Sequence, residues 1–86
     1  MKILMKPVEM IAVHAKEGGL RPYRFRYLEG DAYITIQVKR VVTTTREKIN
    51  GRHTLVFRCE SVIRGMMRPY ELKYDVEAMQ WYLYKL

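Results

Sequence analysis

Apolar and polar residues alternate with a period of two along most of this chain, and this pattern limits the fold more than any other feature. Ile34, Ile36 and Val38, for example, alternate with polar neighbours. Successive side chains of a β-strand point to opposite faces, so this alternation indicates half-buried strands. No segment keeps the 3.6-residue period of a helix, and we expect no helix longer than about two turns. The predicted strands lie near 8–15, 21–28, 33–48, 53–63, 70–75 and 80–85.

Glycine-containing turns separate these runs, and one of them sets a strand register. Asn50-Gly51 favours a two-residue hairpin turn, because both residues tolerate a positive φ. With these residues at its centre, Ile49 faces Arg52 and Val42 faces Cys59. The apolar residues of both strands then share one face, which a slip of one residue would destroy.

Two further turns extend this alignment. A tight turn near residue 30 places Phe25 and Tyr27 on the same face as Ile34 and Ile36. A loop over 64–69 is expected to join the next two strands. The resulting cross-strand pairs are Ile63–Tyr70, Cys59–Tyr74, Arg58–Asp75, Glu60–Lys73, Tyr74–Trp81 and Leu72–Leu83.

The aligned strands share one apolar face, and no predicted helix covers it. Its members are Tyr23, Phe25, Tyr27, Ile34, Ile36, Val38, Val42, Leu55, Phe57, Cys59, Ile63, Tyr70, Leu72, Tyr74, Trp81 and Leu83. A single sheet does not leave such a face in water. We therefore predict an all-β fold, an antiparallel meander of five or six strands closing into a small barrel of SH3-like size. The alternative is a curved sheet paired in a homodimer.

The predicted strand 33–48 is too long to remain straight in a small domain. At about 3.3 Å per residue it would span about 53 Å, whereas a compact chain of this length has a radius of gyration of about 12 Å. We expect a bend near Arg40, where the apolar pattern is interrupted.

The chain is basic, with 16 Lys and Arg against 9 Asp and Glu and a formal charge of +7. A positive excess indicates a phosphate-bearing or otherwise acidic partner, although a merely solvated basic surface has the same composition. Cationic and aromatic side chains on the outer sheet face are the candidate contacts to single-stranded nucleic acid. The candidates are Arg24, Arg26, Tyr33, Lys39, Arg58 and Arg64.

A second candidate feature lies on the apolar face itself. The register of the Asn50-Gly51 hairpin places Arg40 opposite Ser61, and a charge on that face needs a partner. One interpretation is a polar notch in the barrel mouth, formed by Arg40 and Ser61. The other is a bend or bulge that turns Arg40 outward.

No catalytic or metal constellation emerges from the sequence. Cys59 could act with His14 or His53 as nucleophile and base, but the alternation places Cys59 in the core. A metal site needs three or four converging ligands, and two His, one Cys and scattered acids do not supply them. We therefore predict no enzyme activity, no metal and no cofactor.

Several segments resemble a family of short, uncharacterised bacterial proteins. The resemblance is carried by Pro22-Tyr23-Arg24-Phe25-Arg26, Phe57-Arg58-Cys59-Glu60-Ser61, Glu71-Leu72-Lys73-Tyr74 and Trp81-Tyr82-Leu83-Tyr84-Lys85. It runs from about residue 5 to the end and implies no activity. Met5-Lys6-Pro7 is similar to the usual start of that family. The chain is therefore expected to form one β domain over 1–86, with 1–4 as an upstream extension.

Two function classes follow, with one cellular setting. The first is a non-catalytic module that contacts single-stranded nucleic acid, and the second is a protein-interaction or self-assembly module that binds an acidic protein or a second copy. One cysteine excludes an internal disulfide framework, and the short apolar runs predict no membrane segment. A reduced, cytoplasmic protein is the expectation.

Overall fold

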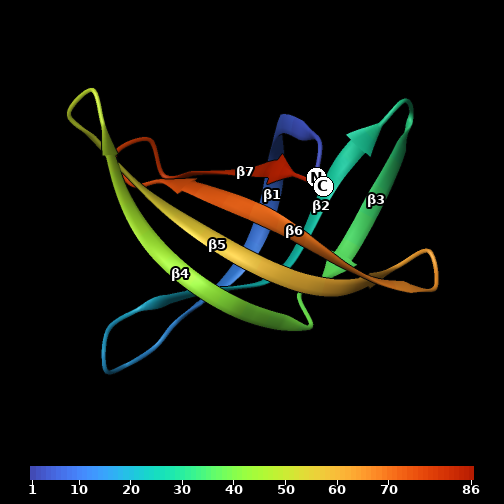
Figure 1. Ribbon diagram of the computed structural model, residues 1–86, viewed down its shortest axis with the longest axis horizontal. Coiled ribbons are helices and arrows are strands. Elements are labelled where there is room, and N and C mark those ends of the chain that lie inside the picture. Colours follow the sequence, from blue (N-terminus) through green and yellow to red (C-terminus); the bar gives the residue numbers. More distant parts are fainter.

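The computed structural model covers residues 1–86 and consists of β-strands joined by turns (Figure 1). The strands are β1 (Ile3–His14), β2 (Leu20–Glu29), β3 (Ala32–Gln37), β4 (Arg40–Ile49), β5 (Arg52–Ile63), β6 (Met66–Asp75) and β7 (Gln80–Lys85). The all-β prediction is confirmed. None of the chain forms a helix long and apolar enough to cross a membrane.

All seven strands belong to one antiparallel sheet, in the order β3-β2-β1-β7-β6-β5-β4. Chain neighbours pair throughout, except β3 with β4. The first strand also pairs with the last, and Lys2 and Leu86 exchange backbone hydrogen bonds at 2.8 and 3.0 Å. The two termini therefore lie side by side (Figure 1). The predicted count of five or six strands is wrong, because the run 33–48 is divided between β3 and β4.

The division falls at Val38 and Lys39, close to the predicted bend at Arg40, which is thereby confirmed. The Val38 N–H donates to the Tyr23 carbonyl on β2 at 2.9 Å. The next N–H, of Lys39, donates to the Glu60 carbonyl on β5 at 3.0 Å. The chain thus leaves one side of the sheet and joins the other within two residues. The folded molecule measures 35 × 27 × 21 Å, well below the length of a straight strand over 33–48.

The prediction of a closed barrel is wrong. The sheet is strongly curved but has two edges, β3 and β4. These edges are successive parts of one bent strand and run end to end instead of side by side (Figure 1). Because β3 pairs only with β2 and β4 only with β5, no ladder joins the two edges. The curved sheet still buries the centre of the apolar face, including Phe25, Phe57 and Leu72.

The β4–β5 hairpin confirms the register set by Asn50-Gly51 over most of its length. Pairing runs as predicted from Ile49↔Arg52 to Thr43↔Arg58. A β-bulge between Val41 and Thr43 then shifts the register by one residue. As a result Val41 faces Cys59, and Val42, predicted in the core, is exposed. A bulge adds one residue to one strand and so reverses the faces beyond it.

A similar irregularity exposes Tyr23, another residue predicted in the core. On the β1–β2 ladder, Arg24 pairs with Ile11 and Pro22 pairs with Ala12. Tyr23 is left without a partner between them, and its side chain is 42% exposed. Pro22 is buried in its place.

The β5–β6 connection is shorter than predicted. Arg64 and Gly65 form a two-residue turn with φ values of 52° and 78°, almost the same as the 51° and 79° of Asn50 and Gly51. The predicted loop over 64–69 is therefore wrong, because β6 already begins at Met66. An Arg-Gly pair is a weaker hairpin signal than Asn-Gly, because Arg is rarely found at positive φ.

The shorter turn moves every β6 partner by four positions. Cys59, for example, faces Tyr70 instead of Tyr74. An even shift leaves each side chain on its own face, so the predicted apolar face survives. The predicted charge pairs Arg58–Asp75 and Glu60–Lys73 are wrong, because Arg58 faces Glu71 and Glu60 faces Pro69. The β2–β3 alignment and the β6–β7 pairs Tyr74↔Trp81 and Leu72↔Leu83 are confirmed.

A hydrogen bond between two side chains lies inside the core. The hydroxyls of Ser61 and Tyr70 are 2.5 Å apart, and both residues are fully buried. The Lys39 N–H also reaches Ser61 Oγ at 3.3 Å, so this contact adjoins the bend. The apolar core around it comprises Phe25, Tyr27, Ile36, Phe57, Cys59, Ile63, Tyr70, Leu72 and Leu83.

Ser61→Ala is expected to destabilise the fold by about 1–3 kcal/mol, because it leaves the buried Tyr70 hydroxyl without a partner. Tyr70→Phe in the same chain removes the orphaned hydroxyl, so the double variant should be destabilised by less than the sum of the two single variants. Urea denaturation of the four proteins gives the coupling. Strictly additive effects would show that the two hydroxyls do not depend on each other.

Candidate nucleic-acid interface

Three of the predicted nucleic-acid residues lie together on the outward face of β2 and β3. Arg24 faces Gln37 across the ladder, and Arg26 faces Thr35. Their side chains point away from the buried Phe25 between them. The Arg26 guanidinium lies 4.2 Å from the centroid of the Tyr33 ring, a cation–π contact. Tyr33 is still 53% exposed.

Glu9 of β1 holds the Arg26 side chain in this position. Arg26 Nε donates to Glu9 Oε1 at 2.6 Å, across the β1–β2 pair Glu9↔Arg26. This hydrogen bond and the charge of Glu9 raise the pKa of Arg26. Both side chains are exposed, so the ion pair orients the guanidinium more than it stabilises the fold. Sequence reasoning missed Glu9, because the pairing of β1 with β2 was not predicted in register.

Arg24 has no ion-pair partner, and a cavity lies beside it. The cavity has a volume of about 450 Å³. It is lined by Glu9, Met10, Ile11, Arg24, Phe25, Arg26 and Thr35. The outward face of β1, β2 and β3, which we call the β2–β3 face, therefore combines one free arginine, one oriented arginine, an exposed tyrosine ring and a concave surface.

The other three predicted contacts lie outside this group. Lys39 is exposed at the bend. Arg58 of β5 is 3.4 Å from Glu71 of β6, and Arg64 in the β5–β6 turn is 3.6 Å from Glu29. The structure thus brings together Arg24, Arg26 and Tyr33 but spreads the remaining candidates over other strands and turns. Outward-facing residues of a strongly curved sheet point in different directions, and a strand pattern does not carry that information.

The polar notch predicted from Arg40 and Ser61 is wrong. Arg40 is exposed and its Nη2 lies 3.0 Å from Glu60 Oε1, its cross-strand neighbour. Ser61 points the other way, into the core toward Tyr70. The bulge at Val42 is the physical reason, because it turns Arg40 to the outer face. The alternative interpretation of Arg40 is the one confirmed.

Cys59 is a core residue, as predicted. It is fully buried, and its Sγ lies 3.7 Å from the Phe57 carbonyl. Burial raises the pKa of the thiol to about 12, so the thiolate needed for nucleophilic chemistry is disfavoured.

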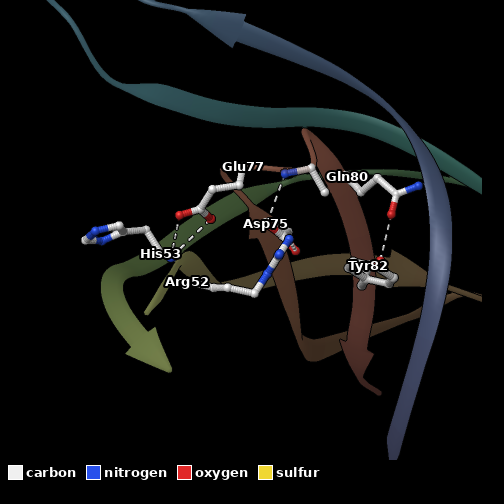
Figure 2. A network of polar contacts seen from close by, with 7 residues as sticks. Arg52, His53, Asp75, Glu77, Gln80 and Tyr82 are labelled. Carbon is white, nitrogen blue, oxygen red and sulfur yellow. Dashed lines mark hydrogen bonds and ion pairs between the residues drawn. The ribbon is translucent and has the colours of Figure 1, made fainter. Parts of the chain in front are cut away.

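A polar network that the sequence did not suggest joins the β4–β5 turn to the β6–β7 turn (Figure 2). Arg52 Nη2 donates to Asp75 Oδ2 at 2.7 Å, and the other carboxylate oxygen accepts the Ala78 N–H at 3.2 Å. Glu77 accepts the His53 N–H, with both of its oxygens at 3.2 Å. The Arg52 guanidinium lowers the pKa of Asp75. The network therefore holds the two turns together.

Comparison of the chain with protein-family models, with curated proteins and with solved structures finds no match. The resemblance carried by the four sequence segments therefore stays a prediction. The function has to be argued from the geometry described above.

The network in Figure 2 predicts a pH dependence. The pKa of Asp75 is lower in the folded chain than in the unfolded chain, so its stabilising effect is complete above the ordinary pKa of Asp. The effect is lost as the pH falls from about 4 through the lowered value. Asp75→Asn should lower the melting temperature at neutral pH. The melting temperature of the variant should then fall less than that of the wild type when the pH is lowered. Parallel thermal melts at several pH values test this, and identical pH profiles would contradict it.

Cys59→Ala is expected to cost roughly 1 kcal/mol or more through poorer packing, without other effects. The wild-type thiol should react with a thiol reagent only as fast as the chain opens. Reaction rates across increasing urea concentrations measure this. A thiol that reacts rapidly under native conditions would contradict the buried position.

Proposed function

We propose that this protein is a non-catalytic binding module that contacts single-stranded nucleic acid through the β2–β3 face. The observation that carries the proposal is the Arg26 guanidinium held over the exposed Tyr33 ring, next to the unpaired Arg24. Proteins that bind single strands combine cations that follow the phosphates with aromatic rings on which bases stack. Both elements occur here within two adjacent strands.

The distribution of charge supports the same proposal. Only six of the 16 basic residues form ion pairs, namely Arg26, Arg40, Arg52, Arg58, Arg64 and Lys73. The remaining cations keep a positive field around the molecule. Such a field attracts polyanions and increases their rate of association.

A second candidate function follows from the two open sheet edges. Along β3 and β4, the backbone groups that face away from the sheet have no strand partner. β4 is ten residues long, and Val42 and Ile49 are exposed on it. An open edge of this kind accepts an added strand from a protein partner or from a second copy. This is the protein-interaction alternative.

Titration of a labelled oligothymidylate at several salt concentrations tests the first proposal. The Arg24→Ala, Arg26→Ala double variant should bind more weakly, and its salt slope should fall by about 0.7 for each phosphate that is no longer neutralised. Tyr33→Leu should weaken binding by about 1–3 kcal/mol for one unstacked base, with the slope unchanged. Glu9→Gln should strengthen binding, because it removes a negative charge and frees Arg26.

The matched control is the Arg46→Ala, Lys48→Ala double variant. This variant also removes two positive charges, but from β4, where neither residue forms an ion pair. Its binding should keep the wild-type dependence on salt concentration. No binding by the wild type at low salt, or equal weakening in both double variants, would contradict the proposal. In that case, concentration-dependent sedimentation that resists salt would support the open-edge alternative.

A further inference from the structure

A second cavity, separate from the β2–β3 face, lies where the sheet fails to close. It has a volume of about 420 Å³ and extends between the edge strand β3, the β5–β6 turn and the paired chain ends. Its apolar lining includes Tyr27, Ile34, Ile36 and Ile63, which belong to or pack against the core. Cavities of this size and lining bind small molecules in other proteins.

Four cationic side chains line the same cavity, against a single acidic side chain. The cations are Lys2, Lys6, Arg64 and Arg68. The acid is Glu29, and Arg64 already pairs with it at 3.6 Å. The other three cations form no ion pair, so a net positive charge remains at the edge of an apolar cavity.

Tyr27 places a hydrogen-bonding hydroxyl beside the same cavity. The residue is only 8% exposed and lines the cavity, while its hydroxyl stays accessible to solvent and makes no hydrogen bond within the protein. The hydroxyl can therefore donate a hydrogen bond to a ligand in the cavity. Lys6 Nζ lies 5.2 Å from the ring centroid. Burial, together with the charge of Glu29, raises the pKa of Tyr27, and the charges of Arg64 and Arg68 partly oppose this shift.

We propose that this cavity binds a small amphipathic anion, a carboxylate or phosphate monoester attached to an apolar chain. The apolar chain would pack against Ile36 and Ile63. The anionic group would meet Lys6 and Arg68 and accept a hydrogen bond from the Tyr27 hydroxyl. This assignment accounts for the excess of cations and the apolar lining together, and it uses the accessible Tyr27 hydroxyl as a donor. It does not rest on nucleic-acid binding, because this cavity and the cavity beside Arg24 share only Thr35 among their lining residues.

Fluorescence of 1-anilinonaphthalene-8-sulfonate, itself an amphipathic anion, provides the test. We expect saturable binding with one site per chain, displaced by decanoate or by decyl phosphate. The more effective of these two competitors identifies the anionic group. The Lys6→Gln, Arg68→Gln double variant should weaken binding by about tenfold or more, because it removes charge-assisted hydrogen bonds.

Two further variants make the result specific. Tyr27→Phe keeps the ring and should still weaken decanoate binding by about threefold to tenfold, since it removes one hydrogen-bond donor. It also serves as the test if the double variant does not fold, as judged by circular dichroism. The Arg46→Gln, Lys48→Gln variant removes the same charge from β4 and should bind like the wild type.

Three results would overturn the assignment. Equal displacement by decanol would show that the charge is not recognised. Equal displacement by inorganic phosphate would show that the apolar lining is not used. Wild-type affinity in both Tyr27→Phe and the Lys6→Gln, Arg68→Gln variant would place the probe elsewhere on the protein.

Discussion

The structure depends on the bend at Val38 and Lys39. Two consecutive backbone N–H groups donate there to opposite parts of the sheet, the first to β2 and the second to β5. Without this bend the seven strands would form an extended sheet with an exposed apolar face, because no helix is present to cover it. The Lys39 N–H also approaches Ser61 Oγ, which bonds to the Tyr70 hydroxyl. The bend is therefore tied to the buried hydrogen bond between Ser61 and Tyr70.

The same bend explains why the molecule has two distinct candidate binding surfaces. It places β3 and β4, the two halves of one bent strand, at opposite ends of the strand order, and both remain edge strands. The open space beside β3 becomes a cavity with basic residues around it, whereas the outward side of β2 and β3 carries the Arg26–Tyr33 contact. A fully closed barrel would have filled its interior with side chains and would have had no free edge.

Period-two alternation predicted most of the core, and the errors are equally instructive. Phe25, Phe57 and Leu72 are buried as expected. The loop over 64–69 was wrong, yet the apolar face remained correct, because the error shifted the register by an even number of residues. The bulge at Val42 had the opposite effect. A shift of one residue exposed Val42 and turned Arg40 from the expected notch toward Glu60.

The sequence by itself determined the all-β fold, the faces of most strand residues and the Asn50-Gly51 hairpin, because these depend on residues close together in the chain. Only the tertiary structure decided the pairing of β1 with β7, the open sheet edges, the Arg26–Glu9 pair and the cavity beneath Tyr27. These features join segments distant in sequence. Alternation is the same for every register that differs by two residues, so it assigns a side chain to a face but not to a partner.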